Sequence, residues 1–439
     1  MSDRQTIALG YSDPVFVDPL EYRVSGQSFL RRELPSSQMF LIKQGLEVFK
    51  RHSPDLPVYD ASQGDGGASL SPIPPEEIVG AIARFLSRSQ TTSYGKPEGD
   101  VRVREVLFNR YYRLEGSTDL SSAHVLTTCG GRDALQKWYQ SIALLTRAAG
   151  QCVIVSAAPW QSYAQGGYLS GLNMLRAPTQ GDFKMTPEGI KHAVEFAQDH
   201  LHPVVGLVLT SPDNPSGVYL TQQEIVDLIE TAVSCGIKFV LLDLMYQMVL
   251  DQEVEHYDIA SLFKTLTPQA RGCVTILDGL TKSVGASNIR HAHLFCGSLT
   301  VAKTIGAISS HTVLTPVTSE ALAFELYRHD DVHKHPWVRR VVEPTQQSRR
   351  LFREQMNSWG YQFVADQGYY AFVRVSPWLH ERVTTVSTLP QYLTSEHGLA
   401  IIPGSVFHQP EFIRFSLANT PEVTLGAINC LHSALVRLP

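Results

Sequence analysis

The sequence has few charged residues and no excess of positive ones. Charged side chains make up 18% of the 439 residues, and the formal net charge is -5, with a pI near 6.3. Binding to nucleic acid needs clustered Lys and Arg to neutralise phosphates. Because no block of like charges occurs, the sequence argues against a nucleic-acid surface.

Cysteines and long apolar runs are also scarce. The six cysteines form no CxxC pair, and they are Cys129, Cys152, Cys235, Cys273, Cys296 and Cys430. This pattern favours free thiols in a reducing compartment over disulfides or zinc. The apolar runs are shorter than the roughly 20 residues of a membrane helix, and the first residues lack the basic and apolar regions of a signal peptide. We therefore expect a cytoplasmic protein, and no histidine spacing indicates a metal site.

The chain is too long for one compact core, so we expect more than one domain. Residues 1–60 read as an N-terminal arm that packs with a small domain. Residues 61–315 are expected to form a large domain and residues 316–439 a smaller α/β domain. A polar segment at 300–345 is expected to lead into a long connecting helix.

Short apolar runs alternate with helical patterns from residue 124 onward. The runs are HVLTTC, CVIVSA, VVGLVLT, KFVLLDL, CVTILD and HLFCGSL. Runs of this length without polar alternation are typical of strands buried on both faces. They predict an α/β fold in which a mostly parallel sheet is covered by helices.

Polar segments follow several of these strands, at the edge where open α/β sheets usually build their sites. In chain order the segments are YGKPEGDVRVR (94–104), TTCGGRDAL (127–135), APWQSY (158–163), SPDNPSG (211–217), DLMY (243–246), TKSVGASNIR (281–290), IIPGSVF (401–407) and FIRFSLA (412–418). In order and spacing they resemble the class I/II aminotransferase family over nearly the whole chain.

The resemblance implies a pyridoxal-phosphate (PLP) enzyme of fold type I, similar to aspartate aminotransferase. Its large domain would hold a mostly parallel, seven-stranded sheet. By this resemblance Lys282 forms the Schiff base with PLP and shuttles a proton at the substrate Cα. A lysine after a strand is ordinarily a surface residue, but the eight-residue spacing to Arg290 matches the family pattern.

Three further residues are implied to contact the PLP ring. PLP stores electrons best when its ring nitrogen is protonated, and Asp243 is the matching carboxylate. Asn214 and Tyr246 match the positions that bind the phenolic oxygen of PLP. Asp243 as a helix cap and the NPSG segment as a simple turn are the alternatives.

The phosphate of PLP would lie against Arg290 and a glycine-containing helix start. Gly130 and Gly131 permit close approach, the helix begins near Arg132, and a helix N-terminus favours an anion. Thr281 is a further contact. The resemblance also implies that Tyr94 reaches the phosphate of a neighbouring subunit, which would make the enzyme at least a homodimer.

The resemblance does not decide which aromatic residue stacks on the PLP ring, but it does imply the substrate class. Trp160 is expected to stack on the PLP ring, with Tyr163 as the alternative, and Trp160 as a core residue is also possible. Arg414 matches the arginine that binds a substrate α-carboxylate through two hydrogen bonds, with Gly64 across from it and Asn214 nearby. An α-amino acid and a 2-oxo acid are therefore the expected substrates.

Some residues depart from the family pattern. Gly279 stands where a serine is common, Asn288 where a glycine is common, and Arg132 where a small or amide residue is usual. His291 and His293 follow Arg290 in place of small residues. These departures keep a second reaction open: a PLP-dependent lyase, cyclase or β/γ-substitution enzyme. A ligand-sensing transcription regulator is disfavoured, because the arm carries no helix-turn-helix signal.

Overall fold

The structure is a computed structural model that describes most of the 439-residue chain. The described residues are 14–17, 21–22, 32–33, 38–70, 73–87, 93–147, 150–179, 181–381 and 383–436. Part of the predicted arm, residues 1–60, lies outside these ranges.

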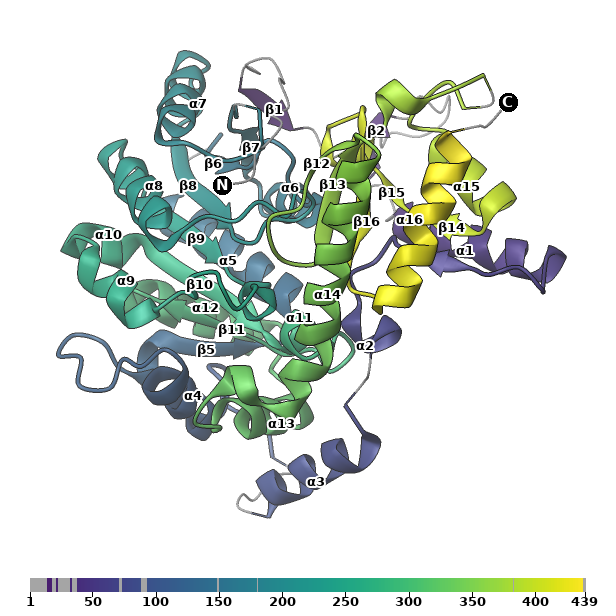
Figure 1. The fold of residues 1–439 in the computed structure, drawn as a ribbon. Helices are drawn as coiled ribbons and strands as arrows, with labels where there is room; N and C mark the ends of the chain where they lie inside the picture. The colour runs from purple at the N-terminus through teal and green to yellow at the C-terminus, as the bar shows by residue number, and fades with distance from the viewer. Residues whose placement is uncertain are drawn as a thin grey trace.

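A large twisted sheet forms the core of the left-hand part of the molecule in Figure 1. Its strand order is β1-β7-β6-β8-β9-β10-β11-β5. The bounds are β1 Val15–Val17, β5 Val125–Thr128, β6 Cys152–Val155, β7 Asn173–Arg176, β8 Val204–Thr210, β9 Phe239–Asp243, β10 Val274–Gly279 and β11 Ala292–Cys296. β1 and β11 run antiparallel to their neighbours, while β7, β6, β8, β9 and β10 are parallel. The predicted seven-stranded sheet is present, and β1 adds an eighth strand from the arm.

Both faces of this sheet are covered by helices, as the continuous apolar strands require. Side chains alternate between the faces along each strand: Val240 and Leu242 pack into the core that includes α8 (Gln222–Ser234), whereas Leu241 packs into the core that includes α5 (Gly131–Thr146). The other helices of this layered part are α3 Pro75–Leu86, α4 Val101–Val106, α6 Gln161–Leu169, α7 Pro187–Asp199, α9 Ile259–Thr265, α10 Pro268–Cys273, α12 Leu299–His311 and α13 Val317–Tyr327.

The C-terminal part is built on the 23-residue helix α14 (Pro336–Ser358), which separates it from the large sheet in Figure 1. A four-stranded antiparallel sheet has the order β12-β13-β16-β15. Its strands are β12 Gln362–Val364, β13 Tyr370–Arg374, β15 Ile402–Pro403 and β16 Phe412–Ser416, and helices α15 (Leu389–His397) and α16 (Pro421–Leu435) pack beside it.

The arm touches both parts of the molecule. β1 extends the large sheet by pairing with β7, while α1 (Gln38–His52) packs against α15. β4 (Tyr59–Asp60) pairs with β14 (Leu399–Ala400) in the small part. Two short segments, β2 Glu21–Tyr22 and β3 Arg32–Glu33, pair with each other.

None of the described helices is long and apolar enough to cross a bilayer. The described residues also contain no cluster of three or more His, Cys, Asp or Glu side chains placed to hold a metal ion.

The parallel strands bring their carboxyl ends to one edge of the sheet, facing the small part. β5 leads into Gly130, β8 into Asn214 and β10 into the short helix α11 (Leu280–Ser283), while β9 ends at Asp243. Segments that are far apart in the sequence therefore meet at this edge.

Candidate active site

A cavity of about 490 Å³ opens at this edge of the sheet. Its lining residues are Gln63, Gly64, Asp65, Gly131, Arg132, Trp160, Tyr163, Asn214, Asp243, Met245, Tyr246, Leu277, Thr281, Lys282, Ser287, Arg290, Tyr370 and Arg414. Every site residue predicted from the sequence lines it, except Gly130 and Tyr94. The structure thus brings together residues that span most of the chain.

Lys282 projects into the cavity from α11, directly after β10. Its Nζ donates a hydrogen bond to the carbonyl oxygen of Gly64. The hydroxyl of Tyr369 donates to the backbone carbonyl of Lys282 at 2.5 Å, which fixes the short helix. The amine is therefore held between α11 and the segment after β4.

Gly279, a departure from the family pattern, has a steric explanation. A Cβ at this position would lie 2.6 Å from the carbonyl oxygen of His291 and 2.7 Å from the Cα of Ala292. A serine therefore does not fit between β10 and β11. Thr281 and Ser287 supply hydroxyl groups to the same cavity instead.

Asp243 ends β9 and is buried. Its carboxylate accepts a hydrogen bond from the backbone N–H of Met245 at 3.0 Å and one from the hydroxyl of Tyr163 at 2.8 Å. Burial raises the pKa of Asp243 to about 6, against these two hydrogen bonds, which lower it. A cationic partner that enters the cavity would stabilise the ionised form of this buried carboxylate.

Asn214, Tyr246 and Arg414 form a connected polar group among the residues that line the cavity. Arg414 donates from Nη1 to Oδ1 of Asn214 at 2.9 Å and from Nη2 to the carbonyl of Ser62 at 2.6 Å. Nδ2 of Asn214 donates to the hydroxyl of Tyr246 at 3.4 Å. Arg414 is buried, and its guanidinium lies 4.3 Å from the centre of the Tyr370 ring.

Two arginines converge at the N-terminus of α5. Arg290 donates to the carbonyls of Ser287 (2.8 Å) and Cys129 (3.3 Å). Arg132 has no hydrogen bond or ion pair with any described residue and lies 5.6 Å from the Trp160 ring. Burial and the charge of Arg290 both lower the pKa of Arg132. Two guanidinium groups at a helix N-terminus form a strong site for an anion.

Gly130 does not line the cavity but makes this arrangement possible. Its φ is +86°, and a Cβ there would lie 2.4 Å from Nη2 of Arg290. Only a residue without a side chain lets Arg290 lie against the loop after β5.

Trp160 and Tyr163 both line the cavity, at the start of α6. Their rings meet edge to face, with centroids 5.4 Å apart. Tyr163 is bound through its hydroxyl to Asp243 and Thr210, a contact that sequence analysis missed. Trp160 is half-buried, with its ring beside Arg132.

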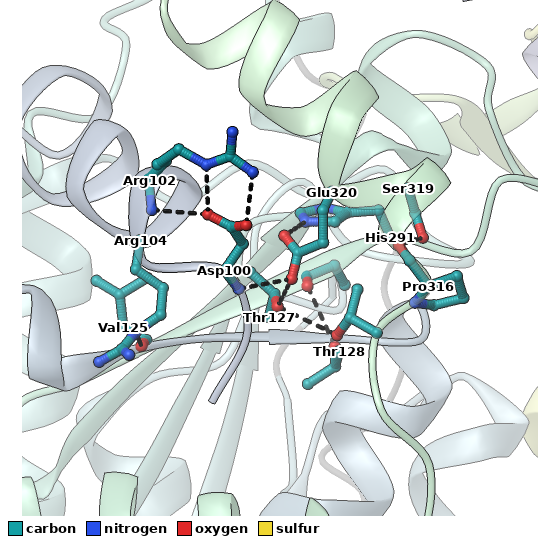
Figure 2. A network of polar contacts seen from close by, with 12 residues as sticks. Asp100, Arg102, Arg104, Val125, Thr127, Thr128, His291, Pro316, Ser319 and Glu320 are labelled. Carbon is teal, nitrogen blue, oxygen red and sulfur yellow. Dashed lines mark hydrogen bonds and ion pairs between the residues drawn. The ribbon is translucent and has the colours of Figure 1, made fainter. Parts of the chain in front are cut away.

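Tyr94 lies outside the cavity and is 98% exposed in the single chain. The loop that follows it is nevertheless firmly held, as Figure 2 shows. Oε1 of Glu320, on α13, accepts hydrogen bonds from the N–H of Asp100 at 3.1 Å and the hydroxyl of Thr127 at 2.5 Å. Asp100 in turn caps α4 through the N–H of Arg102. This loop therefore presents Tyr94 outward from a rigid base.

The cavity is also lined by residues that the sequence did not predict, namely Gln63, Asp65, Met245, Leu277, Ser287 and Tyr370. Tyr370 belongs to the segment GYYAFVRVSP, which the sequence identifies only as a strand of the small domain. Neither its composition nor its spacing indicates that Tyr370 lines the same cavity as Lys282.

Comparison with known proteins gives one consistent result. The sequence pattern of the family "Aminotransferase class I and II" matches residues 61–428. The aspartate aminotransferase of Geobacillus stearothermophilus is 25% identical over 380 residues, which are 82% of this chain and 87% of that protein. A probable aspartate/prephenate aminotransferase of Thermus aquaticus is 25% identical over 407 residues, covering 91% and 97% of the two chains. The solved aspartate aminotransferase of Thermus thermophilus with maleate has a TM-score of 0.76 at 22% identity, over 91% of this chain and 97% of that one.

The fold, with a lysine after one central strand and a carboxylate at the end of the next, defines a fold type I enzyme. Because the family match covers most of the chain, the protein belongs to the class I and II aminotransferase family. It is an aminotransferase, and the predicted family, fold class and transferase activity are confirmed. Members of this family are PLP enzymes.

Proposed function

We propose that this aminotransferase uses PLP bound covalently to Lys282. The observation that carries the proposal is the cavity's charge pattern: two arginines at a helix N-terminus on one side, the carboxylate of Asp243 deep inside and Lys282 between the domains. This set fits a group with a phosphate, a basic ring nitrogen and a carbonyl. Because Arg132 and Arg290 have no acidic partner among the described residues, an anionic phosphate would relieve their mutual repulsion.

The chain's own residues then have distinct tasks. Bound PLP supplies an electron sink for the bonds at the substrate Cα. Asp243 would hold a proton at the ring nitrogen, and Tyr163 keeps that carboxylate in place. Asn214 and Tyr246 would hydrogen-bond the phenolic oxygen, and Trp160 would cover one face of the ring. Lys282 would accept the Cα proton and return it.

Arg414 defines the proposed substrate class. Its guanidinium is fixed by Asn214 and the carbonyl of Ser62, so its orientation is set before any substrate arrives. A planar guanidinium binds a carboxylate through two parallel hydrogen bonds. Because Arg414 and Gly64 line the same cavity, an α-amino acid and a 2-oxo acid are the proposed substrates.

We also propose a homodimer whose subunits share active sites. The support is Tyr94, which is almost fully exposed on a loop anchored by Glu320 (Figure 2). A tyrosine presented on a rigid loop suits a hydrogen bond to the phosphate in the partner subunit. A cytoplasmic location is proposed on the cysteine pattern alone.

Lys282→Ala tests the attachment point. Borohydride should fix the cofactor to the wild-type protein, and peptide mapping should locate it at Lys282. The variant should keep its fold but yield no labelled peptide. Lys303→Ala, which removes an exposed lysine of α12, is the control and should label normally. Label on a different lysine in the wild type would refute the assignment.

The reaction itself is tested with a panel of amino acids, each with and without 2-oxoglutarate. Amino transfer predicts that turnover requires the 2-oxo acid and yields glutamate, identified by mass. Sustained product formation without it would instead support the lyase, cyclase or substitution reactions.

A further inference from the structure

Tyr370 lines the cavity, and segments from both parts of the molecule hold it in place. It begins β13 and is buried. Just before it, the N–H of Gln367 donates to the carbonyl of Gly217 at 2.9 Å, and the Gln367 side chain accepts from the N–H of Asp251 at 2.8 Å. A Cβ at Gly217 would lie 2.4 Å from the carbonyl of Tyr370. The start of β13 is therefore docked tightly on the large domain.

The phenolic oxygen of Tyr370 receives hydrogen bonds from two directions. The hydroxyl of Tyr246 donates to it at 3.4 Å, and the backbone N–H of Gly64 is its second donor. The carbonyl of the same Gly64 accepts the hydrogen bond from Nζ of Lys282. The phenol of Tyr370 and the amine of Lys282 thus meet at one residue.

Two cations line the same cavity as Tyr370. Arg414, from β16, stacks on the ring at 4.3 Å, and Lys282 comes from α11. The carboxylates in the same cavity are engaged elsewhere: Asp65 accepts from the hydroxyl of Ser287 at 3.0 Å, and Asp243 is held at the far end of β9. An oxygen with two donors and two nearby cations is stabilised when it carries a negative charge.

The surroundings of Tyr370 and of its neighbour Tyr246 shift the pKa values of the two phenols in opposite directions. Burial acts to raise the pKa of Tyr370, but the charges of Lys282 and Arg414 and the two hydrogen bonds lower it overall. Burial and the hydrogen bond to Tyr370 instead raise the pKa of Tyr246 well above its usual value. Of this pair, Tyr370 is the phenol that is suited to accept a proton.

We propose that Tyr370 is a catalytic residue that exchanges a proton with Lys282 during each half-reaction. Alkyl amines are protonated at neutral pH, and only the uncharged amine can accept a proton from Cα. In the transfer an N–H bond of the Lys282 ammonium breaks, its electron pair stays on nitrogen, and an O–H bond forms on the phenolate of Tyr370. The reverse transfer restores both groups. The proposal rests on the proposed role of Lys282 at Cα.

Tyr370→Phe removes only the hydroxyl and keeps the ring under Arg414. Loss of a positioned base costs roughly a hundredfold or more in rate, so kcat should fall by about a hundredfold while KM changes by less than about threefold. In the wild type, kcat should rise with pH along a limb that the variant lacks, because the phenolate is the active form. Tyr327→Phe removes a buried phenol whose hydroxyl has no partner among the described residues, and it should retain both the rate and the limb.

A second measurement needs neither cofactor nor turnover. Tyrosinate absorbance of the full-length protein, freed of cofactor, is followed as pH rises. One tyrosine should ionise below the ordinary value of about 10, and this step should vanish in Tyr370→Phe, persist in Tyr327→Phe and move to higher pH in Lys282→Met. If Tyr370→Phe keeps the low-pH step, or keeps wild-type kcat and the same limb, the proposal is wrong. A wild type that transfers no amino groups would instead overturn the proposed function.

Discussion

Replacing Glu320 with glutamine should stabilise the protein at pH 8 more than at pH 5. Glu320 is 3% exposed, and burial raises its pKa from 4.5 to about 7 despite hydrogen bonds from Thr127 and Asp100. His291 lies 3.8 Å away, but burial lowers the pKa of His291 to about 3. The imidazole is therefore neutral above pH 5 and offers no compensating charge.

Proton linkage gives the direction in which pH changes the stability of the folded protein. A carboxyl that binds its proton more tightly when folded makes the folded state less stable as pH rises from about 4.5 to about 7. The full shift corresponds to roughly 3 kcal/mol, at about 1.4 kcal/mol per pKa unit. Between pH 5 and pH 8 about 2.5 kcal/mol of this cost appears. The neutral amide avoids it, and its oxygen can still accept both hydrogen bonds of Figure 2.

The assay is urea unfolding of wild type and variant at both pH values, at fixed protein and cofactor concentrations. The free energy of unfolding of Glu320→Gln, relative to that of the wild type, should be about 2.5 kcal/mol larger at pH 8 than at pH 5. Glu325→Gln, on the same helix, is the control: burial raises the pKa of Glu325, but Arg328 and Arg84 lower it overall. That variant should gain no stability at pH 8. An equal difference at both pH values for Glu320→Gln would refute the reasoning.

Three further substitutions test the proposed site. Asp243→Ala should still bind PLP but lose turnover by roughly a hundredfold or more, since the ring nitrogen loses its carboxylate; near-normal kcat would remove Asp243 from the site. Arg414→Lys should raise KM for α-amino acids by about thirty-fold to a thousand-fold, with little effect on PLP affinity, because lysine offers only a point charge; unchanged KM would make Arg414 structural. Tyr94→Phe should weaken PLP retention by about tenfold to a hundredfold, as one hydrogen bond to a charged group is worth about 1.5–3 kcal/mol; a fully active monomer in sedimentation would contradict the shared site.

Some features escaped sequence analysis because their signals are weak or distant. The strand β7 is short and begins and ends with polar residues, Asn173 and Arg176, so no apolar run marks it. β1 is extended only because it pairs with β7, about 160 residues away in the chain. The steric need for Gly279 likewise arises from the approach of β11 and has no signature in its own segment.

The sequence alone determined which residues stand at the ends of the central strands. Strand periodicity is a local property, so it is enough to place Asn214, Asp243 and Lys282 just after buried strands, and the resemblance to the family implied that they share one site. Tertiary structure decided which side chains hold them there. Tyr163 binds Asp243 across 80 positions, and Tyr370 meets Lys282 through Gly64. Such contacts join segments that are distant in the chain, and they depend on how the large sheet and the C-terminal part pack together, which no local pattern records.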